Sequence, residues 1–88
     1  MSLSSIVLVT GASSGIGHSI CKHLLEKGHR VAGLARRSER LEALKGEFPD
    51  SFLAIQGDVE RVEDILAAKQ QIHSQWGAIT VLVNNAGV

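Results

Sequence analysis

The chain has 88 residues, of which 44% are hydrophobic and 20% charged, enough for one small domain with a modest core. Nine basic and nine acidic residues give a formal net charge of zero, which argues against nucleic-acid and membrane-surface partners. The chain has one cysteine, no apolar run of transmembrane length, and an N-terminus without the basic and apolar regions of a secretory signal. We therefore expect a protein of a reducing compartment, the cytoplasm.

The first predicted unit is a strand, a glycine-rich turn and a helix. Residues 6–9 are apolar and mostly β-branched, which is typical of a buried parallel strand. Residues 10–17 follow, with glycines spaced G-x-x-x-G-x-G, and lead into an amphipathic helix over residues 16–27. Unpaired N–H groups and the positive end of the helix dipole point out of such a turn, so it suits a phosphate. A turn that is glycine-rich for steric reasons alone is the alternative.

The spacing of apolar residues predicts how this helix packs. Its inward face comprises Ile16, Ile20, Leu24 and Leu25, and Gly28 is placed to end it. Cys21 lies near the same face and is interpreted as a small buried hydrophobic residue.

The rest of the chain continues to alternate strand and helix. Strands are predicted over residues 30–34, 52–55 and 79–83, and a helix with a buried stripe over residues 62–76. Another helix is expected from a cap at Ser38 to about Lys45, broken by Gly46 and Pro49. With right-handed crossovers, this order predicts an α/β fold: a partial Rossmann (doubly wound) fold whose parallel sheet has about four strands in order 3-2-1-4, with helices on both faces.

Three motifs, each at the carboxyl end of a predicted strand, resemble the N-terminal half of the short-chain dehydrogenase/reductase family. Residues 10–17 match the family's T-G-x-x-x-G-x-G, Asp58-Val59 matches its D-V, and residues 84–87 match its N-N-A-G. The resemblance covers essentially the whole chain. It implies that residues 1–88 are a truncated NAD(P)-binding Rossmann half-domain of an oxidoreductase.

The same resemblance implies a role for individual residues. The phosphates and the adjoining ribose would be surrounded by Gly11, Ser13, Ser14, Ile16 and Gly17, with Gly15 permitting the turn. Asp58 would contact the adenine amino group beside the backbone of Val59; a cap for the following helix is the alternative for Asp58. The ribose and nicotinamide side would be lined by Asn84, Ala86 and Gly87, while Asn85 would tie neighbouring strands together.

Two arginines favour NADP over NAD. An NAD site usually offers a carboxylate about twenty residues past the glycines, to bind the ribose 2′-hydroxyl. Here Arg36 and Arg37 stand at that place, with no acidic residue beside them. A guanidinium matches a 2′-phosphate in charge and geometry, whereas a carboxylate would repel it. Two merely solvated arginines are the alternative.

The catalytic half of the family pattern is missing from these 88 residues. The family's acid is the tyrosine of a Y-x-x-x-K motif, and this chain has no tyrosine, so we assign it no catalytic residue. No metal site is predicted, because Cys21 and the four histidines lack ligand spacing. We expect an inactive fragment or truncation of a hydride-transferring enzyme that acts on a carbonyl or alcohol; a non-catalytic NADP(H)-binding or sensing module is the alternative.

The association behaviour also follows from the missing half. The parent protein is expected to be a homo-oligomer. The fourth strand would become an uncharged sheet edge, so the isolated chain should be marginally stable or self-associating.

Overall fold

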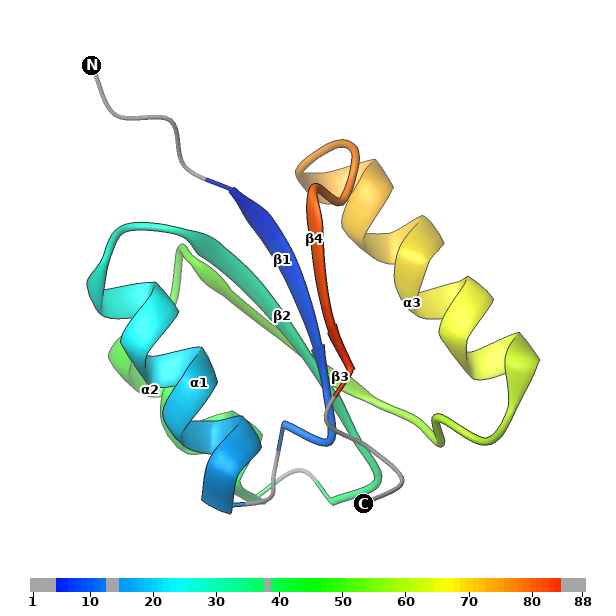
Figure 1. Cartoon of the computed structure of the whole chain (residues 1–88), viewed down its shortest axis with the longest axis horizontal. Helices are drawn as coiled ribbons and strands as arrows, with labels where there is room; N and C mark the ends of the chain where they lie inside the picture. The colour runs from blue at the N-terminus through cyan, green and yellow to red at the C-terminus, as the bar shows by residue number, and fades with distance from the viewer. Residues whose placement is uncertain (1–4, 13–14, 38, 85–88) are drawn as a thin grey trace.

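The computed structural model describes residues 5–12, 15–37 and 39–84. Strands and helices alternate along them, as predicted (Figure 1). The elements are β1 (Ile6–Thr10), α1 (Gly15–Glu26), β2 (Arg30–Ala35), α2 (Glu39–Glu47), β3 (Phe52–Gln56), α3 (Val62–Gln75) and β4 (Val81–Asn84).

The four strands form one parallel sheet in the order β3-β2-β1-β4, which confirms the predicted partial Rossmann topology. Their register aligns the carboxyl ends. Thr10 of β1 lies opposite Leu34 on one side and Asn84 on the other, and Ala35 lies opposite Gln56. The loops that leave β1, β2 and β3 therefore emerge at one edge of the sheet.

Helices cover both faces of the sheet, also as predicted. Helices α1 and α2 lie on one face and α3 on the other (Figure 1). The first layer buries one set of alternate strand residues: Val7, Val9, Val31 and Phe52, together with Cys21, Leu25, Leu41 and Leu44 of the helices. The second buries Leu8, Ala32, Leu34, Leu53 and Ile55 against Ala68 and Ile72 of α3. Both faces are apolar because parallel strands with crossover helices are covered on both sides.

Gly28 ends α1 as expected. It has a φ of 92°, and the N–H groups of Gly28 and His29 donate to the carbonyls of Leu25 (3.0 Å) and Leu24 (3.1 Å). This is the Schellman arrangement, in which a glycine with positive φ lets the last carbonyls of a helix find donors.

Two predicted boundaries differ from the structure by two residues, and the others differ by at most one. Gly46 does not break α2, which continues through it to Glu47, because a single exposed glycine costs a helix only about 1 kcal/mol. The last strand begins at Val81 rather than Ile79. The Thr80 N–H donates to the Ile6 carbonyl (2.9 Å), and its hydroxyl accepts from the Ile6 N–H (2.9 Å), so this residue joins β1 partly through its side chain.

The expected inward face of α1 is wrong at its first residue. Ile16 is 69% exposed, whereas Ile20 and Leu24 are partly buried and Leu25 is buried. Gly17 and Cys21 occupy the inward positions instead, so the buried stripe is rotated around the helix from the predicted one.

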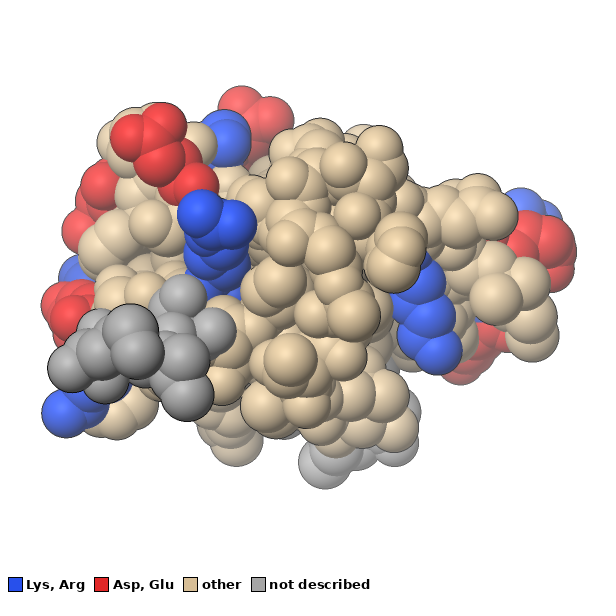
Figure 2. Space-filling model, turned by 90° about the horizontal axis from the view of Figure 1, so that it is seen from above, with Lys and Arg blue, Asp and Glu red and all other residues tan. Residues whose placement is uncertain are grey.

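The outer surface of the described residues is mixed in charge. Seen from the amino ends of the strands, charged side chains of both signs lie toward the two ends of the molecule, with a largely uncharged area between them (Figure 2). None of the helices in residues 5–12, 15–37 and 39–84 is long and apolar enough to cross a lipid bilayer.

Candidate functional site

The glycine turn begins where β1 ends. Gly11 has a φ of 66°, a conformation that glycine adopts without the steric cost that a side chain brings. The N–H of the next residue, Ala12, donates to the Leu34 carbonyl (3.3 Å), which fastens the turn to the end of β2. Helix α1 starts at Gly15, so its N-terminus opens toward the carboxyl edge of the sheet. The predicted contacts at Ser13, Ser14, Ala86 and Gly87 lie outside the described residues.

The residues that follow β2 and β3 are brought together. The Arg36 Nε lies 4.0 Å from Asp58 Oδ1, and the Arg36 side chain is 72% exposed, against 28% for Asp58. Such a loose, exposed ion pair contributes at most about 1 kcal/mol, so the guanidinium is able to turn toward another anion. Arg37 is also exposed. The edge of the sheet therefore presents a cation beside a half-buried carboxylate.

Gln56 and Gly57 join the end of β3 to the end of β2. The side-chain amide of Gln56 donates to the Arg36 carbonyl (3.1 Å), and the Gly57 N–H donates to the Ala35 carbonyl (2.9 Å). These contacts continue the strand pairing one residue beyond the sheet. The backbone that carries Arg36 is consequently held at the same level as the loop that carries Asp58.

The loop between β3 and α3 is organised by two carboxylates. Asp58 Oδ1 accepts from the Glu60 N–H (2.9 Å), which closes a local turn of the kind that aspartate favours. The Asp58 N–H in turn donates to Asp64 Oδ2 (2.8 Å), in the first turn of α3. The N-cap of α3 is Arg61, with no side-chain cap hydrogen bond, so the interpretation of Asp58 as a helix cap is wrong.

The remaining predicted positions differ in exposure. Gly17 is buried in α1, Gly15 is exposed at its start, and Val59 packs against the apolar layer under α3. At the end of β4, the Asn84 side-chain oxygen accepts a hydrogen bond from the Thr10 hydroxyl (3.0 Å). Asn84 therefore ties β4 to the strand that leads into the glycine turn.

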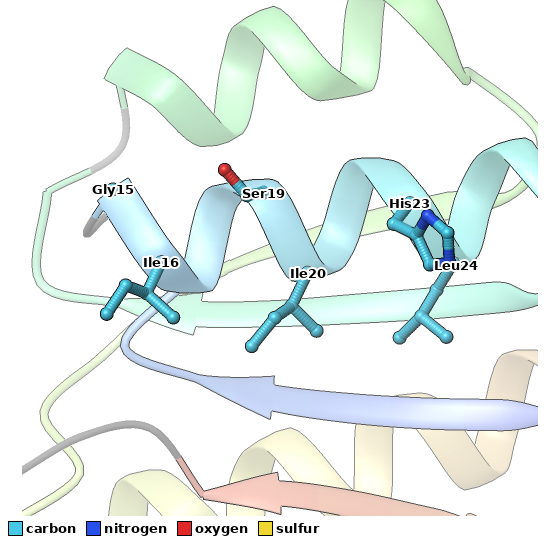
Figure 3. Close-up of a pocket in the computed structure, with 6 residues that line it drawn as sticks. All are labelled: Gly15, Ile16, Ser19, Ile20, His23 and Leu24. Atoms are coloured by element: carbon cyan, nitrogen blue, oxygen red, sulfur yellow. The ribbon is translucent and has the colours of Figure 1, made fainter.

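Two open grooves lie away from Arg36 and Asp58. One, of about 410 Å³, runs along α1. Ile16, Ile20 and Leu24 project in a row from one side of that helix (Figure 3). The other, of about 480 Å³, runs along α3 and is lined by Leu66, Lys69, Gln70, His73, Ser74, Ala78 and Ile79. The groove along α1 begins at the predicted site residues Gly15 and Ile16, whereas no predicted site residue lines the groove along α3.

The chemistry available at the strand ends is binding chemistry. A cation, a carboxylate and a glycine turn at a helix N-terminus can recognise a polar, phosphorylated ligand. Cys21 adds no nucleophile, because burial raises the pKa of its thiol to about 12, a rise only partly offset by a backbone hydrogen bond. Within residues 5–12, 15–37 and 39–84, no three His, Cys, Asp or Glu side chains are grouped to hold a metal ion.

Sequence reasoning missed Gln56 and Asp64. Both act on the backbone of a predicted site residue, Gln56 on the Arg36 carbonyl and Asp64 on the Asp58 amide. The only signal in the sequence was the position of Asp64, an acidic residue in the first turn of a predicted helix, which indicates helix stabilisation rather than a contact six residues back.

The chain is similar to known proteins in sequence and in fold. Residues 5–88 match the family model described as short chain dehydrogenase. A "Probable NADP-dependent dehydrogenase in aabA 3′region" of Dichelobacter nodosus is 49% identical over 94% of this chain and 78% of its own length. The "NADP-dependent 3-hydroxy acid dehydrogenase YdfG" of Salmonella typhi is 46% identical over 94% of this chain and 34% of its own.

Among solved structures, a short-chain dehydrogenase from Streptomyces avermitilis superimposes with a TM-score of 0.89 and 41% identity. The match covers 97% of this chain and 31% of that one. The chain thus spans most of the Dichelobacter relative but only about a third of the other two proteins.

Proposed function

Because this chain belongs to the short-chain dehydrogenase family, we propose that it is the NADP(H)-binding portion of an oxidoreductase. The parent enzyme would transfer hydride between a nicotinamide cofactor and a carbonyl or alcohol. Two relatives carry NADP dependence in their names, and the described site residues fit such a ligand. The bound cofactor supplies the hydride chemistry, and the residues of this chain bind and orient it.

The fit begins at the glycine turn. Gly11 turns the chain at the end of β1 with a positive φ, and the positive end of the α1 dipole would favour a diphosphate at the start of that helix. On this proposal Gly11, Gly15, Ile16 and Gly17, with Ser13 and Ser14, surround the diphosphate and its ribose. The exposure of Ile16 supports this assignment, because a residue that meets a ligand at the helix start is not packed in the core.

The observation that carries the proposal is the pairing of Arg36 with Asp58 at the ends of two adjacent strands. An adenosine bound across these ends would reach both groups. Asp58 would accept from the adenine amino group beside Val59, and Arg36 and Arg37 would bind a ribose 2′-phosphate. Asn84, with Ala86 and Gly87, would line the path toward the nicotinamide.

We assign no catalytic residue to this chain. The proton donor of the family is a tyrosine, and the sequence contains none. We propose that the donor, the carbonyl or alcohol site and the contacts of a homo-oligomer belong to further parts of a parent enzyme, and that this enzyme is cytoplasmic. The unpaired, buried Cys21 supports that location.

The absent tyrosine favours a second candidate for the chain by itself, a non-catalytic module that binds or senses NADP(H). Incubation with NADPH and a panel of aldehydes and ketones separates the two. Loss of absorbance at the reduced nicotinamide band would show hydride transfer by these 88 residues and exclude the module.

Titration calorimetry of the chain with NADPH and with NADH tests the proposal. We expect NADPH to bind about 10- to 100-fold more tightly, because a charge-assisted hydrogen bond to the 2′-phosphate contributes roughly 1.5–3 kcal/mol. Equal affinities would overturn the NADP assignment. If neither ligand bound, the chain would not be a cofactor-binding unit by itself.

A further inference from the structure

We propose that Asp64 is a positioning residue, which holds Asp58 in the orientation that recognises adenine. The inference rests on the proposed function, in which Asp58 contacts the adenine ring. Asp64 lies on α3, outside the three motifs that the family resemblance supplies, and would not itself touch the ligand.

Asp64 makes a hydrogen bond to the backbone of Asp58. The Asp64 carboxylate reaches back from the first turn of α3, and its Oδ2 accepts the Asp58 N–H at 2.8 Å. The side chain of Asp58 is held separately, because its Oδ1 accepts the Glu60 N–H at 2.9 Å. Both the main chain and the carboxylate of Asp58 are therefore fixed before any ligand arrives. Only the main-chain contact depends on Asp64.

A carboxylate at position 64 suits this contact for two reasons. A negative charge in the first turn of a helix is favoured by the helix dipole. A carboxylate also makes a stronger bond to an N–H than a neutral acceptor does. Arg61, at the N-cap, makes no side-chain cap hydrogen bond. The loop before α3 is held instead by the bond to Asp64, by the Glu60 N–H that donates to Asp58 Oδ1, and by the Arg61 N–H, which donates to the Asp58 carbonyl at 3.0 Å.

Gly57 has no side chain and so leaves room for Asp64. A Cβ at Gly57 would lie 3.3 Å from the Asp64 Cβ and 3.0 Å from the Leu34 Cδ1. Both separations are tighter than ordinary contacts, so a larger residue would push Asp64 away from the Asp58 amide. Gly57 thus acts as the spacer that brings the start of α3 close to the end of β3.

The consequence is a selective effect on ligands. If Asp64 cannot accept the Asp58 N–H, the loop loses a hydrogen bond that positions the Asp58 main chain, next to where the adenine would lie. The glycine turn, on β1, makes no use of this contact. Loss of Asp64 should therefore weaken ligands that carry adenine and leave adenine-free phosphates unaffected.

The test compares variants by titration with adenosine 2′,5′-bisphosphate and, separately, with inorganic pyrophosphate. Asp64→Ala should weaken the adenosine ligand about tenfold, the effect of roughly 1.4 kcal/mol, and leave pyrophosphate within about twofold. Asp64→Asn keeps an oxygen that can accept the same N–H, as a neutral and therefore weaker acceptor, and should restore part of the affinity. Glu63→Ala is the matched control, since it removes an exposed carboxylate from the same turn.

A second variant, Gly57→Ala, displaces Asp64 without removing it, and should also weaken the adenosine ligand selectively. Thermal unfolding of every variant shows whether it is folded at the titration temperature. The inference is overturned if folded Asp64→Ala or Gly57→Ala binds the adenosine ligand like the original chain, or if both ligands weaken equally. If the unmodified chain fails to bind adenosine 2′,5′-bisphosphate at all, the proposed function itself falls, which is a distinct result.

Discussion

The Thr10 hydroxyl donates to the side-chain oxygen of Asn84 at 3.0 Å, joining the last residues of β1 and β4. Thr10 is only 6% exposed, whereas Asn84 is exposed, so only the donor side of this bond is shielded from water. The bond sits at the entrance to the glycine turn and at the outermost strand of the sheet. The placement of β4 therefore depends on a polar pair as well as on the strand ladder.

Thr10→Val removes the hydroxyl and nearly preserves the shape of the side chain. We expect the free energy of unfolding to fall by about 1 kcal/mol, because the hydrogen bond from the buried Thr10 hydroxyl to Asn84 is lost. Urea unfolding followed by circular dichroism measures the change. Asn84→Asp keeps an acceptor and serves as the comparison. A Thr10→Val protein as stable as the original would show that the bond contributes nothing.

Arg36→Asp should reverse the proposed cofactor preference. The introduced carboxylate would repel a 2′-phosphate and could accept from a 2′-hydroxyl, so NADPH should weaken about 10- to 100-fold while NADH holds or improves. Arg30→Asp makes the same charge change at the opposite end of β2 and should leave the ratio of affinities unchanged. Unaltered binding of NADPH to Arg36→Asp would remove the 2′-phosphate role from this residue.

Gln56→Leu tests whether the Arg36 backbone needs its side-chain donor. Losing the 3.1 Å bond to the Arg36 carbonyl should reduce the ratio of NADPH to NADH affinity by about threefold to tenfold. The control is Gln70→Leu, an exposed position on α3. Titration of both variants with NADPH and NADH measures this ratio. If the ratio for Gln56→Leu were unchanged, Gln56 would serve only to join β2 and β3 and would have no effect on cofactor preference.

Alkaline pH should destabilise the fold through Cys21. Burial raises the pKa of its thiol from 9.0 to about 12, so between these values the unfolded chain releases a proton that the folded chain retains. Stability attributable to this group is complete below pH 9 and declines as the pH rises, by about 1 kcal/mol at pH 10.

Urea unfolding at pH 7 and pH 10 measures the decline in stability, and Cys21→Ala provides the comparison. The alanine variant should start less stable, because it leaves a small cavity, but should lose less stability at alkaline pH. Parallel losses in both proteins would mean that other groups, such as lysines, account for the whole effect.

The exposed edge at β4 should promote self-association. This strand pairs with β1 on one side, no described strand pairs with it on the other, and Leu82 is 55% exposed. Leu82→Lys places a charge on the edge and should lower the association seen by sedimentation over a range of concentrations. Gln71→Lys adds the same charge to the surface of α3. Equal behaviour of the two variants would point to net charge rather than to the edge.

The sheet could be predicted from the sequence because apolar runs mark its strands. The alternation of these strands with helices then leaves few possible topologies for a parallel sheet. Gly28 ends α1 where expected, because a glycine with positive φ after the last turn of a helix forms the Schellman motif, which can be recognised from sequence. Gly46 was misread because glycine weakens a helix without stopping it. The prediction that Ile16 faces inward is wrong because Gly17 and Cys21 occupy the inward positions of α1. Hydrophobicity alone ranks an isoleucine as more buried than a glycine, so it does not predict this arrangement.

The sequence predicted which strand ends carry the candidate site, but not the contacts between its residues. Parallel order brings Arg36 and Asp58 to one edge, and the sequence sufficed for that expectation. The contacts of Gln56 and Asp64 depend on how the loop after β3 folds back toward β2 and α3. A pattern of residue types along the sequence does not indicate these contacts.

The hydrogen bonds around Arg36 and Asp58 have a consequence for protein engineering. Arg36, Asp58 and the two side chains that hold their backbones, Gln56 and Asp64, all fall within residues 30–64. The contacts among these four residues therefore lie within one segment of the chain. The segment can therefore be exchanged as a cassette. Replacing it with the corresponding stretch of an NAD-dependent relative, with crossover points after Gly28 and within α3, should transfer cofactor preference in one step rather than through separate substitutions.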